Sequence, residues 1–161
     1  MNEIFSSVQI TSNVLYGGNY NPNIWGQNNW QDLYMDIYEP LDDDLDNRPL
    51  VFFMFGGSFV AGSKTNADIV ELCTRYAKRG YVAVAIDYRL TSDLIWFPNP
   101  ETAYRAVAKG MHDLKGAVRW FRMNDDLYND YRIDINRIYA GGVSAGAIVA
   151  VNTAYLNEED E

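Results

Sequence analysis

Ser144 stands at the centre of the segment Gly142-Val143-Ser144-Ala145-Gly146, a Gly-x-Ser-x-Gly pattern. A serine hydroxyl at the tip of a tight strand-to-helix turn is exposed to substrate, lies at the positive end of a helix and can attack a carbonyl carbon. The flanking glycines keep side chains out of the crowded turn. Residues 138–140 have the apolar character of a strand entering this turn, and residues 145–156 that of a helix leaving it. We therefore predict that Ser144 is a catalytic nucleophile.

A second segment, Phe55-Gly56-Gly57-Ser58-Phe59, directly follows a continuous apolar run. Adjacent glycines let the backbone turn tightly, with its N–H groups pointing inward. Such donors stabilise the oxyanion that forms when a serine attacks an ester, and each contributes about 3 kcal/mol to the transition state. We predict that the N–H groups of Gly57 and Ser58 form an oxyanion hole together with that of Ala145. A glycine-rich turn without a chemical role is the alternative.

The strands that must position these groups are indicated by hydrophobic patterning. Residues 4–15 and 33–38 alternate between apolar and polar side chains and predict half-buried antiparallel strands. Between them, residues 16–31 are rich in Asn, Gly, Tyr and Trp without a regular period, which predicts a loop whose aromatic side chains could line a pocket. Continuous apolar runs at 50–55 and 81–86 predict strands that are buried on both faces, and residues 133–140 predict a third strand of this set.

Three helices are expected between and after these buried strands. Their apolar residues recur at helical spacing in 66–79, in 101–124 and in 145–156, and Gly80 follows the first of them as a stop signal. Two antiparallel strands followed by a β-α-β-α-β-α order predict an α/β fold. We expect a mixed, mostly parallel sheet with helices on both faces.

These segments together resemble the N-terminal half of an α/β-hydrolase of the carboxylesterase and lipase type. The matching segments span nearly the whole chain and are Met35 to Pro40, Phe55 to Phe59, Gly80 to Leu90, Asp113 with Ala117 to Trp120, and Gly142 to Ala147. The family's glycine loop usually begins His-Gly-Gly-Gly or Tyr-Gly-Gly-Gly, so this chain has Phe55 in the first position and Ser58 in place of the third glycine. The resemblance also implies that Asp87-Tyr88-Arg89 and Asp113 are structural.

A triad serine needs a base, which is normally a histidine oriented by a carboxylate. His112 is the only histidine in 161 residues. It precedes Ser144, whereas the family's order along the chain is nucleophile, acid, histidine. We interpret His112 as a surface or interhelix residue, and residues 1–161 as the N-terminal portion of a single, incomplete α/β-hydrolase domain. The missing partner of the exposed sheet edge is then the C-terminal half of that domain, or self-association occurs there.

Composition excludes several other functions. The formal net charge of −9 opposes binding to nucleic acids or anionic membranes. One cysteine and one histidine cannot form a zinc site without several carboxylates, and Cys73 is expected to be a buried free thiol. The segment Gly62-Ser63-Lys64-Thr65 lacks the upstream glycine of a phosphate-binding loop, so we interpret it as the lead-in to a helix. We expect neither a cofactor nor a metal.

The apolar runs are also far shorter than the roughly 18 residues of a membrane-spanning helix, which predicts a soluble protein without a membrane span. The first residues lack the basic segment and apolar run of a secretory signal. The compartment stays open, since a removed signal would allow a secreted or periplasmic protein.

Two functions remain for this sequence. The first is a serine hydrolase that cleaves small-molecule carboxylic esters through an acyl-serine intermediate, with these 161 residues lacking the acid and histidine of the triad. The second is a noncatalytic hydrolase-like module used for binding, which would explain the absent base and the unusual Phe55 and Ser58. The sequence does not identify the substrate, because the pockets of this fold are built largely by segments that follow the nucleophile.

Overall fold

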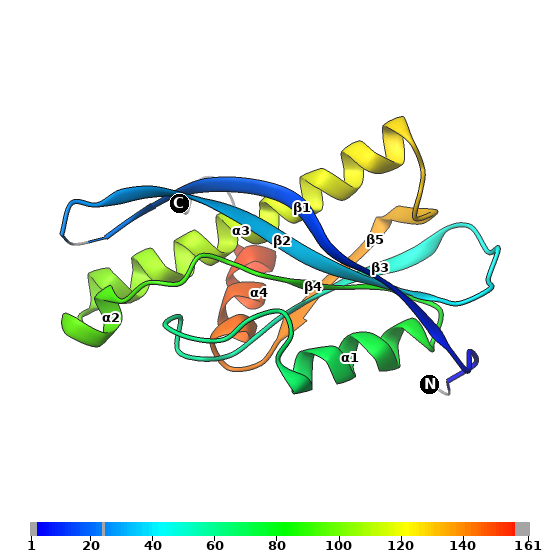
Figure 1. Ribbon diagram of the computed structural model, residues 1–161, viewed down its shortest axis with the longest axis horizontal. Coiled ribbons are helices and arrows are strands. Elements are labelled where there is room, and N and C mark those ends of the chain that lie inside the picture. Colours follow the sequence, from blue (N-terminus) through cyan, green and yellow to red (C-terminus); the bar gives the residue numbers. More distant parts are fainter. Residues whose placement is uncertain (1–2, 24, 157–161) are drawn as a thin grey trace.

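The computed structural model describes residues 3–23 and 25–156, which form one mixed sheet with helices packed against it (Figure 1). The strands are β1 (Val8–Pro22), β2 (Asn28–Pro40), β3 (Arg48–Met54), β4 (Val82–Ile86) and β5 (Ile133–Gly142). The helices are α1 (Ala67–Ala77), α2 (Asp93–Trp96), α3 (Pro100–Leu127) and α4 (Ala145–Tyr155). Each helix and buried strand expected from the sequence is present, and the short α2 is added before α3.

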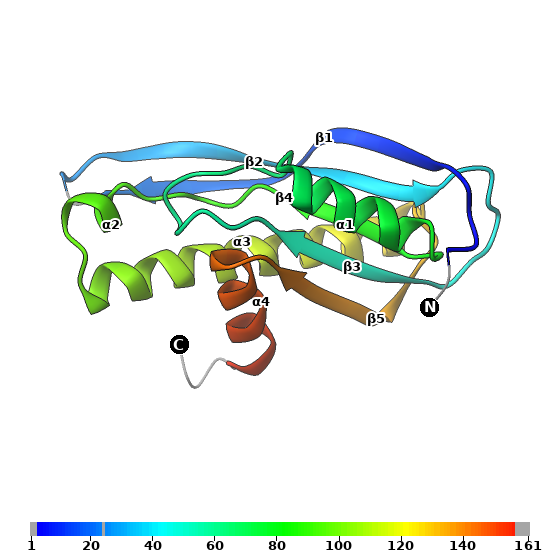
Figure 2. The same cartoon turned by 90° about the horizontal axis from the view of Figure 1, so that it is seen from below.

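The strand order in the sheet is β1-β2-β4-β3-β5. β3 pairs in parallel with both β4 and β5, while β2 pairs antiparallel with β1 and β4. The arrows of β3 and β5 accordingly point the same way in Figure 2. Since the carboxyl ends of parallel strands meet at one edge of a sheet, the segments that follow β3, β4 and β5 gather there. This is the edge that carries the predicted site residues.

Helices cover both faces of the sheet, as neighbouring residues of β3 show. Phe52 packs edge-on against Phe121 of α3, with ring centroids 5.6 Å apart. The next residue, Phe53, packs against Tyr76 of α1 at 5.0 Å. Successive side chains of a strand point to opposite faces, so α1 and α3 lie on opposite sides of the sheet. The predicted fold class is therefore confirmed.

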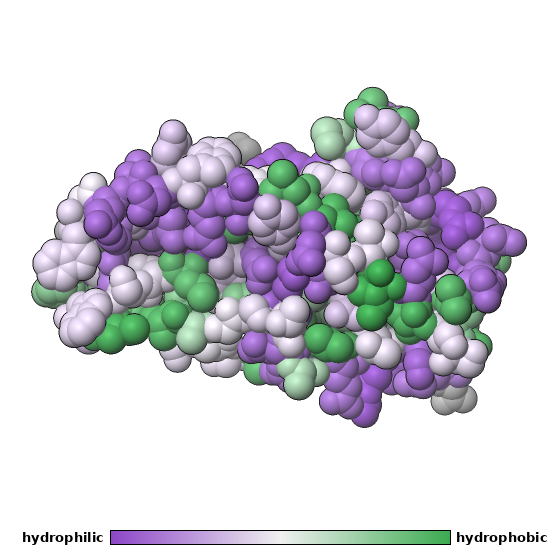
Figure 3. Space-filling model, in the orientation of Figure 1, coloured by the Kyte–Doolittle hydropathy of each residue, from purple (hydrophilic) through white to green (hydrophobic). Residues whose placement is uncertain are grey.

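The prediction of a loop over residues 16–31 is wrong. β1 and β2 continue as a long antiparallel hairpin in which Tyr20 pairs with Trp30 and Pro22 with Asn28. The usual alternation is missing because both faces of this outer hairpin are largely exposed, and the polar Asn side chains are tolerated there. An edge-on contact between Tyr20 and Trp30 at 5.3 Å supports the pairing. Hydrophilic and apolar side chains are interspersed over the surface shown in Figure 3.

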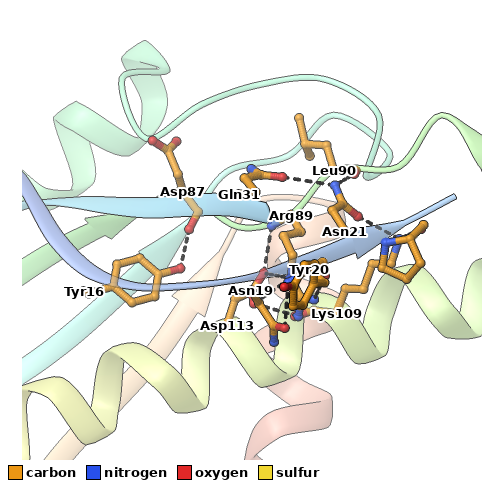
Figure 4. A network of polar contacts seen from close by, with 11 residues as sticks. Tyr16, Asn19, Tyr20, Asn21, Gln31, Asp87, Arg89, Leu90, Lys109 and Asp113 are labelled. Carbon is orange, nitrogen blue, oxygen red and sulfur yellow. Dashed lines mark hydrogen bonds and ion pairs between the residues drawn. The ribbon is translucent and has the colours of Figure 1, made fainter. Parts of the chain in front are cut away.

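A buried ion pair ties β4, α3 and β1 together (Figure 4). Arg89 follows β4, and its Nε donates to Asp113 Oδ1 of α3 at 2.9 Å while its backbone N–H donates to Oδ2 at 2.8 Å. Arg89 Nη1 also donates to the carbonyl oxygen of Tyr20 at 2.7 Å. Burial raises the pKa of the Asp113 carboxyl, and the hydrogen bonds and charge of Arg89 oppose this shift. The structural role implied for these residues agrees with this geometry.

Cys73 is fully buried in α1, as expected for a free thiol. Burial raises its pKa, and the nearby Asp36 adds to the shift. Within the described parts of the chain, no helix has the length and apolar character that a bilayer crossing requires.

Two ion pairs that involve α3 should differ sharply in their contribution to stability. We expect Asp113→Ala to lower the free energy of unfolding by about 3 to 5 kcal/mol, because it leaves the buried Arg89 without its counter-charge. The matched variant is Glu101→Ala, which breaks an exposed pair with Arg105 on the same helix and should cost at most about 1 kcal/mol. Urea unfolding followed by circular dichroism measures both, and equal losses would contradict this assignment.

Candidate active site

Ser144 occupies a strained turn between β5 and α4. Its backbone has φ 49° and ψ −115°, a sparsely populated positive-φ conformation that costs a non-glycine residue about 1 to 3 kcal/mol. The turn is held because the N–H of Val143 donates to the carbonyl oxygen of Met54 at 3.0 Å, and the N–H of Gly146 donates to that of Val143 at 2.9 Å. The side chain of Ser144 makes no capping hydrogen bond to the helix, and the residue is exposed. Its hydroxyl is thus presented to solvent rather than used in the fold.

The glycines on either side of Ser144 are required by the space around them. A Cβ added to Gly146 would lie 2.2 Å from the carbonyl oxygen of Met54. A Cβ added to Gly142 would lie 2.6 Å from that same oxygen. Both contacts are with backbone atoms, which cannot rotate away. The Gly-x-Ser-x-Gly pattern is therefore explained by the close approach of this turn to the end of β3.

The glycine loop after β3 lies directly beside Ser144. A Cβ placed on Gly56 would be 3.2 Å from the Cβ of Ser144 and 3.1 Å from the carbonyl oxygen of Val143. Gly57 and Ser58 follow with φ of 122° and 54°, so both adopt positive φ. The structure thus brings together Ser144, Ala145 and the 55–59 loop.

The backbone N–H groups of the three predicted donors are available. Among the described residues, the N–H groups of Gly57, Ser58 and Ala145 have no hydrogen-bond acceptor. Ala145 is the first residue of α4, so its N–H lies at the positive end of the helix. An anion beside Ser144 would provide an acceptor that the fold itself does not.

Phe55 fills the position where the family usually has a polar residue, and Tyr88 supports it. The two rings stack with centroids 4.3 Å apart and an interplanar angle of 20°. The Tyr88 hydroxyl donates to the carbonyl oxygen of Phe55 at 2.8 Å, and burial raises the pKa of this phenol. At the other end of the loop, the N–H of Thr91 donates to the carbonyl oxygen of Phe59 at 2.8 Å. The segment after β4 therefore holds both ends of the glycine loop.

His112 is exposed on α3. It lines a cavity of about 280 Å³ between β1 and α3, and another of about 320 Å³ between α3 and α4. Neither of these two cavities includes Ser144 or the 55–59 loop. The structure does not bring the single histidine together with the predicted nucleophile.

Sequence reasoning missed the burial of Lys64. Lys64 is only 6% exposed, and its ammonium group contacts Asp36. Its backbone N–H donates to Asp87 Oδ1 at 2.8 Å, and the pKa of that carboxyl is raised by burial, an effect that this hydrogen bond opposes. A lysine in a polar segment ordinarily indicates an exposed side chain, so no local signal pointed to burial.

The aromatic residues at the hairpin tip border open cavities. Trp30 lines one of about 340 Å³ with residues 90–92, and Trp25 lines another of about 510 Å³ with Phe97. No group of three or more His, Cys, Asp or Glu residues with the arrangement of a metal site occurs in the part of the chain that the structure describes.

The strand order and the strained serine turn define the fold of an α/β-hydrolase. The BD-FAE family model matches residues 35–161, so the chain belongs to the BD-FAE family. Among curated proteins, it is 30% identical over 112 residues to Esterase LipC of Mycobacterium tuberculosis, which covers 70% of this chain and 24% of LipC. The aligned part is thus about a quarter of the length of LipC.

Solved esterases share the fold. The native structure of a thermophilic esterase, Est2, from Thermogutta terrifontis superposes with a TM-score of 0.61 at 26% identity, covering 97% of this chain and 48% of that one. The same esterase phosphonylated by sarin gives a TM-score of 0.59 at 32% identity, covering 76% of this chain and 40% of that one. The chain thus spans about half the length of these structures.

Substitutions at two neighbouring positions of the glycine loop should differ sharply in their effect on the free energy of unfolding. Gly57→Ala places a Cβ 2.0 Å from the carbonyl oxygen of Ala61 at φ 122°, so we expect it to lower the free energy of unfolding by about 2 kcal/mol or more. Ser58→Gly relieves a positive φ of 54° and should change it by no more than about 1 kcal/mol. Urea midpoints compare the two, and similar losses would rule out the loop conformation described above.

Proposed function

We propose that this protein hydrolyses carboxylic esters through an acyl intermediate on Ser144. The observation that carries the proposal is the exposed, strained Ser144 beside three N–H groups without an acceptor among the described residues. In the first step Ser144 Oγ attacks the ester carbonyl, its proton passes to a base, and the carbonyl oxygen becomes an oxyanion. The N–H groups of Gly57, Ser58 and Ala145 stabilise that charge. Collapse of this tetrahedral intermediate expels the alcohol, which takes up the proton from the base, and leaves the acyl group on Ser144. Water then attacks the acyl-serine ester, which releases the carboxylic acid and restores the Ser144 hydroxyl.

The comparisons support the coarser part of this proposal. Esterase LipC and the Thermogutta terrifontis esterase are similar to this chain, and the latter is phosphonylated by sarin and phosphorylated by paraoxon. Organophosphorus compounds react with nucleophiles that are activated for acyl transfer. We infer that the corresponding nucleophile of this chain is Ser144, and that its substrates are small-molecule carboxylic esters.

The proton acceptor, in this proposal, comes from outside these 161 residues. The only histidine, His112, is exposed on α3, and neither of the two cavities that it lines includes Ser144. β5 is an edge of the described sheet, and its Tyr139 is 51% exposed. An unpaired edge of this kind is available to another segment. We propose that either the C-terminal half of the domain or a second copy pairs with it, and that the former supplies the acid and the histidine.

Replacement of Ser144 tests the nucleophile directly. In the full-length protein, we expect Ser144→Ala to abolish labelling by a fluorophosphonate probe and to lower kcat for p-nitrophenyl acetate by about 10⁴-fold or more. Ser7→Ala, which alters an exposed serine before β1, is the matched control and should keep wild-type probe labelling and wild-type kcat. Equal labelling and turnover in Ser144→Ala and wild type would reject the proposal and favour the noncatalytic binding module.

The origin of the base is tested by comparing residues 1–161 alone with the full-length protein. We expect kcat/KM to be at least about 10³-fold lower for residues 1–161, because the oxyanion donors without a base give only residual catalysis. Circular dichroism checks that the compared proteins are folded. Comparable rates would show that a base exists within these residues after all.

A further inference from the structure

Lys64 is a buried cation that lies behind the glycine loop rather than in it. Its side chain is 7% exposed, and Nζ lies 3.1 Å from Asp36 Oδ1 and 3.2 Å from Asp36 Oδ2 of β2. Nζ also donates to the side-chain oxygen of Asn13 in β1 at 2.9 Å. The backbone N–H of the same residue donates to Asp87 at the end of β4. Lys64 is therefore fixed to β1, to β2 and to the segment that directly follows β4.

Asn13, which accepts a hydrogen bond from Lys64, has an unusual backbone conformation. Asn13 has φ 59° and lies in the irregularity of β1 between Thr11 and Val14. Its backbone N–H donates to Asp36 Oδ1 at 2.7 Å, so one irregular residue contacts both members of the ion pair. A bulge re-aims groups that a regular strand would point elsewhere. The pair is thus fully hydrogen-bonded where a buried charge would otherwise be unfavourable.

The residues that precede Lys64 are packed tightly against the glycine loop. A Cβ on Gly62 would lie 2.5 Å from the Phe55 ring and 2.7 Å from the carbonyl oxygen of Gly56. The carbonyl oxygen of Ala61 lies 2.0 Å from where a Cβ of Gly57 would be. The N–H groups of Val60 and Ala61 donate to the carbonyl oxygen of Gly57, at 3.0 and 3.2 Å. Residues 61–64 therefore form a close-packed support for residues 55–57, and a shift of one displaces the other.

Stability alone does not account for a charged pair at this place. A buried ion pair contributes little more to stability than apolar side chains of similar size, because desolvation offsets the attraction. What it does supply is a defined distance and direction between two elements. Apolar side chains, whose contacts have little directionality, would not set that distance and direction.

We propose that the Lys64–Asp36 pair positions the N–H groups of Gly57 and Ser58 for oxyanion binding beside Ser144. The inference rests on the proposed esterase function. Both residues act through the loop and not on the substrate, so they are positioning residues. Their loss should weaken the transition state more than the binding of the ester, because the oxyanion exists only after attack.

The test uses the double variant Asp36→Asn/Lys64→Met of the full-length protein, which removes both charges at once and leaves neither unpaired. We expect a folded protein whose kcat for p-nitrophenyl acetate falls by about 10-fold or more while KM changes by less than about twofold, because misplaced donors lose transition-state binding. The rate ratio of an oxoester to its thionoester should also fall, since sulfur accepts hydrogen bonds poorly from a well-placed donor. Lys78→Met, which breaks a partly exposed contact with Glu3 at 3.9 Å, is the matched control.

If the double variant does not fold, Asn13→Gly replaces it. Glycine suits the positive φ at this position and removes one acceptor of Lys64 Nζ, so we expect a folded protein with a roughly threefold lower kcat and a lower oxoester to thionoester ratio. If kcat falls only in proportion to the folded fraction, and the oxoester to thionoester rate ratio is unchanged, the positioning role is overturned. If wild-type turnover did not depend on Ser144, the esterase proposal itself would fail, which is a distinguishable result.

Discussion

The site depends on one close approach, in which the turn after β5 rests on the backbone at the end of β3. The carbonyl oxygen of Met54 accepts the N–H of Val143 and leaves no room for side chains on Gly142 or Gly146. Parallel pairing of β3 with β5 brings both strand ends to the same edge, so the contact follows from the topology. Ser144 then has to adopt a positive φ, and the glycine loop that leaves β3 is carried alongside it. Without this contact, Ser144 and the N–H groups proposed to bind the oxyanion would belong to unrelated loops.

Around that contact, buried polar groups locate the loops while apolar side chains supply the core. Arg89 and Asp113 join the segment after β4 to α3, and Lys64 and Asp36 join the segment that follows the glycine loop to β2. The apolar rings of Phe52 and Phe53 fix how the helices cover the sheet. Dispersion contacts of that kind have little directionality, whereas a hydrogen-bonded ion pair sets distance and orientation. The two kinds of interaction therefore have separate consequences, one for the stability of the layers and one for the geometry of the edge.

Much of this arrangement was predictable because its signals are local. The runs in β3 and β4 are apolar throughout since both faces of the sheet are covered, and the glycines beside Ser144 mark a crowded turn. The outer hairpin was missed because its residues are largely exposed on both faces, so its sequence lacks the alternation of apolar and polar residues that indicates a strand. Lys64 was missed for a different reason. Its burial depends on Asp36 and Asn13, whose proximity arises only when β1, β2 and the loop are assembled.

Geometry and reactivity are separable in such a site. The described residues hold the Ser144 hydroxyl and the three neighbouring N–H groups in place largely through backbone contacts, which do not change with protonation. A serine hydroxyl remains a weak nucleophile until a base takes its proton, and base strength depends on a titrating side chain and its environment. The single histidine sits on α3, which packs mainly against α4 and β1. In the proposed function, the groups assigned to oxyanion binding lie at the ends of β3 and β5, whereas proton transfer depends on a titrating side chain elsewhere, so the two can be altered separately.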